Sequence, residues 1–293
     1  MRIIKTRKIT PYLYLLPYAL VTIFIYGYSI PSIFVFSFQR VRGITGEFIG
    51  FANYAYVFSD LEFQYAIKNN LQMLIIVPII IFFALVIAVF IFEGVRGWKF
   101  YRTAIFIPYI VPITVAGITF GYIFTLRGVL NEFLSIINLK PDIDWLGNPD
   151  IALWTLMSVV VWKEVGFGMM LFLARLMSID ESLYDAAKID GANWIRRFVH
   201  ITIPQMSTIM EFFGVITVIN LLSWVFAYAY VVTFGGPGNA TMVLELFIYK
   251  QLMRWSIPRV GTGAAGSVLL FLIVLILVFG LIRLRKSLDI DIE

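Results

Sequence analysis

The sequence predicts an all-α polytopic membrane protein with six transmembrane helices. Of its 293 residues, 60% are hydrophobic and 14% are charged, whereas soluble globular chains are about 45–50% apolar and about 25% charged. The mean hydropathy of +0.89 is an average over the whole chain, so the apolar excess is not confined to one anchor. The length suits a single transmembrane domain over residues 1–293.

Six apolar ranges approach the roughly 20 residues that a helix needs to cross a bilayer. Five of them carry no charged residue, and the fourth contains Lys163 and Glu164 near its middle. Prolines inside the ranges predict kinked or broken helices, because proline removes an intrahelical hydrogen bond. The predicted spans are residues 12–38, 71–92, 104–126, 151–174, 212–234 and 264–282, and their prolines are Pro17, Pro31, Pro78, Pro108 and Pro112.

The positions of Lys and Arg predict the orientation of the spans. With six spans, both termini lie on one side, and the segments on that side carry 14 Lys and Arg in 70 residues, against 8 in 85 on the other side. Positive charge accumulates on the cytoplasmic side of membrane proteins. We therefore expect both termini in the cytoplasm, and the net charge of +5 indicates topology rather than nucleic-acid binding.

Several classes of function are excluded by composition. The chain has no cysteine and a single histidine, His200, so disulfide, thiol and metal-centre chemistry is not expected. It contains no Gly-x4-Gly-Lys-Ser/Thr phosphate loop. No pairing of acid, base and nucleophile indicates an enzyme. We expect neither a cofactor nor a metal in this chain.

The longest predicted cytoplasmic segment, residues 175–207, has the pattern of a short helix, a turn and a second helix. Ser178 followed by Glu181 predicts a capping box at the first helix, and Gly191 suits the left-handed residue that ends it. A second amphipathic stretch then runs to Pro204, where the fifth predicted span is approached. Such a segment below the membrane is typical of a docking element.

This loop resembles the "EAA" loop of bacterial ABC importer permeases. Their pattern is Glu-Ala-Ala-x3-Gly-x9-Ile-x-Leu-Pro, and the spacing here is the same, with Asp185 in place of Glu and Ile203 in place of Leu. Tyr184–Ala192 is similar to the form found in carbohydrate importers, of the maltose and glycerol-3-phosphate permease type. Residues 233–241 resemble their "TGGGP…T" loop, with Phe234 replacing one glycine. The resemblance extends over residues 12–284.

The resemblance implies an ABC importer type I permease fold and a set of partners. These are a second homologous permease, two ATPase subunits that hold ATP and Mg, and an extracytoplasmic solute-binding protein. The loop at 178–204 would dock the ATPases and transmit their motion to the spans. The ATPase-docking residues so implied are Tyr184, Asp185, Ala186, Ala187, Asp190, Gly191, Ala192 and Pro204.

Candidates for the substrate pathway lie in the fourth and fifth predicted spans. Asn220, Trp224 and Tyr228 recur every four residues, which places them in one polar and aromatic stripe on a helix. Charge in the middle of a span is costly and usually functional. Lys163 and Glu164, with the preceding Trp162, are therefore candidates too. The alternatives are packing against the partner permease for the stripe, and ion pairing or snorkelling for the charges.

Gly235, Gly236 and Pro237 are expected to form a rigid external turn that can contact the binding protein. For the whole chain we expect a transport subunit for a sugar or oligosaccharide. The alternatives are an importer of glycerol 3-phosphate or another sugar derivative, and an ATP-independent secondary transporter. The few ionisable groups in the spans and the docking loop argue against the last of these.

Overall fold

The computed structural model describes residues 3–42, 45–139 and 143–289, and it is predominantly helical, which confirms the predicted fold class. In the described residues, five helices are long and apolar enough to cross a membrane, and a bent pair of helices brings the number to six if it counts as one span. These spans are Pro11–Ser37, Leu61–Phe92, the pair Trp98–Ile110 and Ile113–Ile123, Pro149–Leu176, Trp194–Ser223 and Val260–Leu281.

The chain divides into two compact units. The first comprises residues 1–60 and 247–272, and the second comprises residues 61–246 and 273–293. The first unit contains α1 (Ile3–Ser37), the strands β1 (Gln39–Arg42) and β2 (Thr45–Phe48), and α2 (Ala52–Ser59). Two helices run through both units, α13 (Leu244–Met253) and α14 (Val260–Asp289). The expectation of a single domain remains a prediction.

The second unit contains the remaining helices. They are α3 (Leu61–Met73), α4 (Ile76–Phe92), α5 (Trp98–Ile110), α6 (Ile113–Ile123), α7 (Val129–Ile136), α8 (Pro149–Leu176), α9 (Glu181–Ile189), α10 (Trp194–Arg197), the π-helical turn η1 (Phe198–Thr202), α11 (Ile203–Ser223) and α12 (Phe226–Val232).

Three spans differ from the ranges read from hydropathy. The second begins at Leu61, because the less apolar α3 runs into α4. The third is broken, since α5 and α6 meet at an angle of 98° before Pro112. The fifth begins at Trp194, where the second helix of the loop continues into α11, and it ends at Ser223. Hydropathy marks the apolar residues of a helix, but hydrogen bonding decides where the helix begins and ends.

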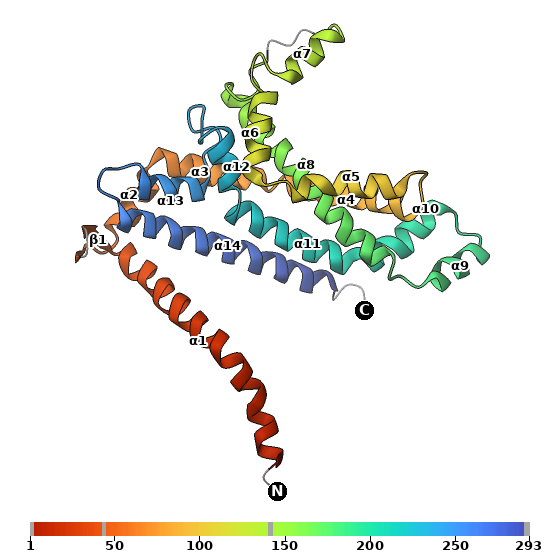
Figure 1. The fold of residues 1–293 in the computed structure, drawn as a ribbon, viewed down its shortest axis with the longest axis horizontal. Coiled ribbons are helices and arrows are strands. Elements are labelled where there is room, and N and C mark those ends of the chain that lie inside the picture. Colours follow the sequence, from red (N-terminus) through yellow and green to blue (C-terminus); the bar gives the residue numbers. More distant parts are fainter. Residues whose placement is uncertain (1–2, 43–44, 140–142, 290–293) are drawn as a thin grey trace. The chain divides into compact units, whose positions relative to one another are not determined.

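Two of the expected proline effects are breaks: α3 and α4 are separated at Leu74 and Ile75, just before Pro78, and α5 and α6 are separated at Pro112. Pro17 and Pro31 lie inside α1 and Pro108 lies inside α5, and these helices continue through them. Pro112 precedes α6, which turns away from α5 at this point (Figure 1). A further interruption, at Trp224 and Val225, separates α11 from α12 without any proline.

The core of the second unit is built around α8, which packs along α4 and α5. Its buried side chains include Leu156, Met169 and Phe172, all with no exposed surface. Two glycines allow the close approach. A Cβ on Gly166 would meet the backbone of α5, 3.2 Å from the Cα of Phe106, and a Cβ on Gly168 would meet Phe213 of α11 at 2.6 Å. The spans that flank the site are therefore fixed by glycine contacts.

The first unit is held by polar contacts at the hairpin β1–β2. Asn53 of α2 donates hydrogen bonds to the carbonyls of Ser37 and Gln39, both at 2.9 Å. Arg259 donates to the Tyr56 hydroxyl at 2.6 Å and lies 3.8 Å from the ring centroid of Trp255. These contacts order the end of α1 and the start of α14.

Substitution of Gly166 should loosen the α5–α8 contact. Gly166→Ala places a methyl group against the α5 backbone, which cannot move as a flexible side chain can, so we expect a loss of about 1–3 kcal/mol in the free energy of unfolding. Gly121→Ala in α6 is the matched control, because nothing lies within 4 Å of its added Cβ. Thermal unfolding in detergent measures both. Equal midpoints for the two variants would contradict the close contact.

Candidate functional site

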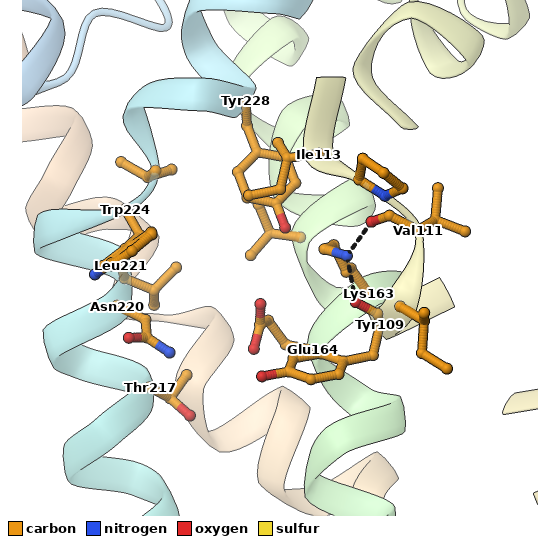
Figure 2. Close-up of a pocket in the computed structure, with 14 residues that line it drawn as sticks. Tyr109, Val111, Ile113, Lys163, Glu164, Thr217, Asn220, Leu221, Trp224 and Tyr228 are labelled. Atoms are coloured by element: carbon orange, nitrogen blue, oxygen red, sulfur yellow. Dashed lines mark hydrogen bonds between the residues drawn. The ribbon is translucent and has the colours of Figure 1, made fainter. Parts of the chain in front are cut away.

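A cavity of about 490 Å³ lies among α5, α6, α8, α11 and α12. This volume is in the range of small-molecule sites, about 300–1,000 Å³. Its wall combines apolar side chains with polar and aromatic groups (Figure 2). The lining residues that carry a polar group are Tyr109, Lys163, Glu164, Thr217, Asn220, Trp224 and Tyr228.

The structure brings five of the six predicted pathway residues to this cavity. Glu164 points into it from α8, and Asn220 lies on the opposite wall (Figure 2). Trp224 and Tyr228 line it as well, although α11 ends at Ser223 and the predicted stripe is not one continuous helix. The break still leaves the three residues on the same side.

Trp162 does not line the cavity. Its side chain is 40% exposed and packs edge-on against Phe120 of α6, with the ring centroids 4.9 Å apart. Residues one or two positions apart on a helix point in different directions, so Trp162 and Glu164 cannot share a face. The described structure thus gives Trp162 a packing role between α8 and α6.

Lys163 lines the cavity, but its ammonium group is hydrogen-bonded to backbone carbonyls. Its ammonium donates to the carbonyls of Pro108 at 3.1 Å, Tyr109 at 2.6 Å and Val111 at 2.5 Å. The residue is 5% exposed. A lysine ammonium has three donors. All three are accounted for by the break between α5 and α6, which leaves none for a ligand.

The hydroxyl of Tyr228 is the opposite case. The residue is 4% exposed, and its Oη atom is buried with no hydrogen-bond partner among the described residues. Leaving a buried hydroxyl unpaired costs about 1–3 kcal/mol. Figure 2 shows the Tyr228 hydroxyl pointing into the cavity, above Glu164. A ligand with hydroxyl groups could supply the missing partner.

Two further wall residues were not singled out by the sequence. Thr217 lies one turn before Asn220 on α11, and its position at i−3 was a signal for the same face. Tyr109 stacks on Phe167 of α8 with the centroids 4.8 Å apart, and no local pattern indicates this contact.

A second functional region is the loop after α8, where the predicted short helix is present as α9. Its N-cap is Asp180, whose side chain accepts a hydrogen bond from the Ser182 N–H at 2.9 Å. This bond holds the pKa of Asp180 below its usual value. The predicted capping box of Ser178 and Glu181 is wrong, because the Ser178 hydroxyl donates to the Arg175 carbonyl instead.

The end of α9 has the geometry that the sequence predicts. Gly191 has a φ of +76°, in the left-handed region. Its N–H bonds the Lys188 carbonyl at 3.0 Å, and the Ala192 N–H bonds the Ala187 carbonyl at 2.9 Å. Together these bonds form a Schellman motif, which glycine accommodates without strain. The chain therefore turns sharply after α9.

The loop at 178–204 is attached to neighbouring helices by two side-chain hydrogen bonds, while its helix α9 is exposed. Tyr184 is 3.0 Å from Thr202 through their hydroxyls, and Trp194 donates to Glu93 at the end of α4 at 2.8 Å. By contrast, α9 has no buried residue, and Ile189 is 87% exposed. The predicted docking residues on or beside α9 that are exposed are Asp185, Ala186, Asp190 and Gly191, and Pro204 is exposed at the start of α11. The exposed side of α9 is therefore not covered by other described parts of the chain.

The predicted external turn is braced internally. Gly235 has a φ of +84°, and the Gly236–Pro237 peptide is cis. The Thr241 hydroxyl is 2.6 Å from that of Thr233 and donates to the Gly236 carbonyl at 2.7 Å. Asn69 of α3 donates to the carbonyls of Asn239 and Met242. These hydrogen bonds hold the segment in a defined turn. Its external position and its contact with a binding protein stay predictions.

Glu245, in α13 beyond the fifth span, was not predicted. Its Oε2 accepts a hydrogen bond from the Phe226 N–H at 2.8 Å, at the first residue of α12. Burial raises the pKa of Glu245 to about 7, and the bond from Phe226 opposes this rise. The Glu245 side chain thus caps α12, the helix that follows the interruption at Trp224 and Val225.

Comparisons with known proteins identify the family and the fold of the chain. Residues 49–289 match the family described as binding-protein-dependent transport system inner membrane component. The chain is 33% identical over 278 residues to the probable ABC transporter permease protein YurN of Bacillus subtilis (strain 168), covering 93% of this chain and 95% of that one. It is 30% identical over 291 residues to the arabinooligosaccharides transport system permease protein AraP of the same organism, covering 96% and 90%.

The fold is shared with a solved transporter. A chain in the crystal structure of a bacterial alginate ABC transporter, in complex with an alginate pentasaccharide-bound periplasmic protein, aligns with a TM-score of 0.79. The sequence identity is 24%, and the alignment covers 96% of this chain and 97% of that chain.

Removal of the Tyr228 hydroxyl should not destabilise the protein, because no hydrogen bond is lost. We expect the thermal midpoint of Tyr228→Phe in detergent, measured without solute, to equal or exceed that of the unmodified chain. Thr241→Val also removes one buried hydroxyl, but it loses two contacts, so a cost of about 1–3 kcal/mol is expected. A Tyr228→Phe variant as unstable as Thr241→Val would mean that the hydroxyl is already paired.

Proposed function

The chain belongs to the family of binding-protein-dependent transport system inner membrane components, and from this premise we propose that it passes a sugar or short oligosaccharide through the cavity around Glu164, Asn220 and Tyr228. It is a permease subunit of an ABC importer, a transport component and not an enzyme. The main observation that supports a sugar as the solute is the composition of the cavity wall.

That wall suits a neutral polyhydroxylated solute. Sugars present hydroxyl groups at the ring edge and C–H groups on the ring face, so amides, carboxylates and aromatic rings can bind them together. Asn220 and Glu164 supply polar partners, and the unpaired Tyr228 hydroxyl adds another. Trp224, 68% exposed, supplies an aromatic surface. Relatives named for arabinooligosaccharide transport support this solute class.

A glycerol phosphate or another anionic derivative suits the wall less well. The one acidic side chain in the wall, Glu164, would repel a phosphate, most strongly where water is scarce. Lys163 could offset this only by giving up its carbonyl partners. The local charges therefore favour a neutral solute.

The exposed face of α9 supports docking of ATPase subunits. We place α9 on the cytoplasmic side, with both termini, because of the distribution of Lys and Arg. Closure of two ATPases on ATP and Mg would pull α9 as a rigid element, and its anchors to Glu93 and Thr202 would transmit this motion to α4 and α11. A second permease and an external binding protein would complete the importer.

Substitution of Gly191 should uncouple transport. Nothing lies within 4 Å of an added Cβ, so Gly191→Val acts only through its φ of +76°, which β-branched residues rarely adopt. We expect solute uptake to be lost while the chain remains in the membrane. Gly191→Asn is the matched control, since asparagine tolerates this conformation, and it should retain most uptake. Uptake by the valine variant at the level of the asparagine variant would contradict the docking role.

Co-purification tests the proposed assembly. The tagged chain, expressed with its neighbouring genes and extracted in mild detergent, should carry with it an ATPase and a second six-span permease, identified by mass spectrometry. The accompanying binding protein can then be screened by calorimetry against neutral sugars and sugar phosphates. A chain that purifies alone, with uptake intact and without ATP, would overturn the importer function.

A further inference from the structure

Lys163 has an unusual set of partners for a cation in the middle of a span. Its three donors go to three backbone carbonyls of one segment, those of Pro108, Tyr109 and Val111. No ion pair of Lys163 within 4.0 Å occurs among the described residues. The role of this side chain must therefore be sought in the segment that it binds.

That segment is the break between α5 and α6. The carbonyl of Pro108 would normally accept the N–H of residue 112, but residue 112 is proline and has none. Val111 is extended, and the chain then turns through 98°. Carbonyl groups left without partners in a bilayer cost several kcal/mol each. Lys163 therefore supplies the hydrogen bonds that the break removes.

The interruption between α11 and α12 is satisfied by an acidic side chain. There the Phe226 N–H at the start of α12 donates to Glu245 at 2.8 Å. An ammonium on carbonyls and a carboxylate on an N–H are both charge-assisted hydrogen bonds, which are stronger than neutral ones. The α5–α6 interruption is thus held in place by a side chain of α8, and the α11–α12 interruption by a side chain of α13.

The two pieces beyond the interruptions form one packed body. α6 and α12 pack side by side, and a Cβ on Gly117 of α6 would lie 3.1 Å from the Cβ of Val231 of α12. Their first turns contribute Ile113 and Tyr228, which lie together at one end of the cavity (Figure 2). The orientation of α6 and α12 therefore decides how open that end of the cavity is.

We propose that Lys163 is a positioning residue, which holds the α6–α12 pair in the arrangement that closes the external end of the cavity, with Glu245 of α13 holding the first residue of α12. The external position of this end rests on the proposed function and its orientation. Lys163 acts on the solute only through this arrangement, because its donors are already engaged.

Cysteine labelling tests this role directly, because the chain has no cysteine of its own. In an Asn220→Cys background, a membrane-impermeant maleimide added from outside reports access to the cavity in the nucleotide-free complex. We expect Lys163→Met, which has no donors, to raise the labelling rate about tenfold. Lys163→Arg retains donors and should label at close to the parent rate.

Glu245 provides a second pair of variants, should Lys163→Met fail to assemble. Glu245→Gln keeps an acceptor oxygen for the Phe226 N–H, whereas Glu245→Leu removes it. We expect faster external labelling for the leucine variant only. An identical rate for leucine and glutamine variants, or for Lys163→Met and Lys163→Arg in assembled complexes, would overturn the proposal. Equal increases from both sides of the membrane would also overturn it, because they would indicate general loosening.

Labelling separates this inference from the proposed function, because it needs no transported solute. If uptake and ATPase co-purification hold while labelling is unchanged in Lys163→Met, the positioning role fails and the importer function stands. If no ATPase co-purifies, the importer function fails, and labelling of the isolated chain still decides whether Lys163 holds the cavity end closed.

Discussion

The arrangement of the cavity depends on the hydrogen bonds from the Lys163 ammonium to three carbonyls at the end of α5. Backbone groups inside a bilayer need partners within the protein, so a helix can break there only where side chains replace the lost bonds. Lys163 meets this need from α8. Without such partners a 98° turn in the middle of a span would be too costly to persist.

The same need for backbone partners explains why the adjacent residues Lys163 and Glu164 have different roles. Lys163 faces the break and serves the backbone, while Glu164 faces the cavity and remains available to a solute. Residues next to each other on a helix point in different directions, so one mid-span pair can serve both purposes. Tight packing of α8 against α5 through Gly166 brings the ammonium within reach of the carbonyls.

The loop at 178–204, the predicted docking element, is held by interactions of another kind. Its geometry is local: Asp180 caps the start of α9, and Gly191 ends it in a Schellman motif. Contacts from Tyr184 and Trp194 fix the loop to helices that continue into the spans. Its outer face, with Ile189 exposed, is not covered by any other part of the chain that the structure describes. An anchored but uncovered helix can be moved by a partner and can transmit that movement.

The sequence by itself determined the membrane class, the apolar segments of the spans and the end of α9, because hydropathy and a left-handed glycine act over a few residues. It also selected Asn220 and Tyr228, which the structure brings to the cavity, while their role in a substrate pathway stays a prediction. Only the tertiary structure decided that α6 turns away from α5, that Trp162 packs outside the cavity and that Glu245 caps α12. These features depend on contacts between residues far apart in the chain, and no local pattern records them.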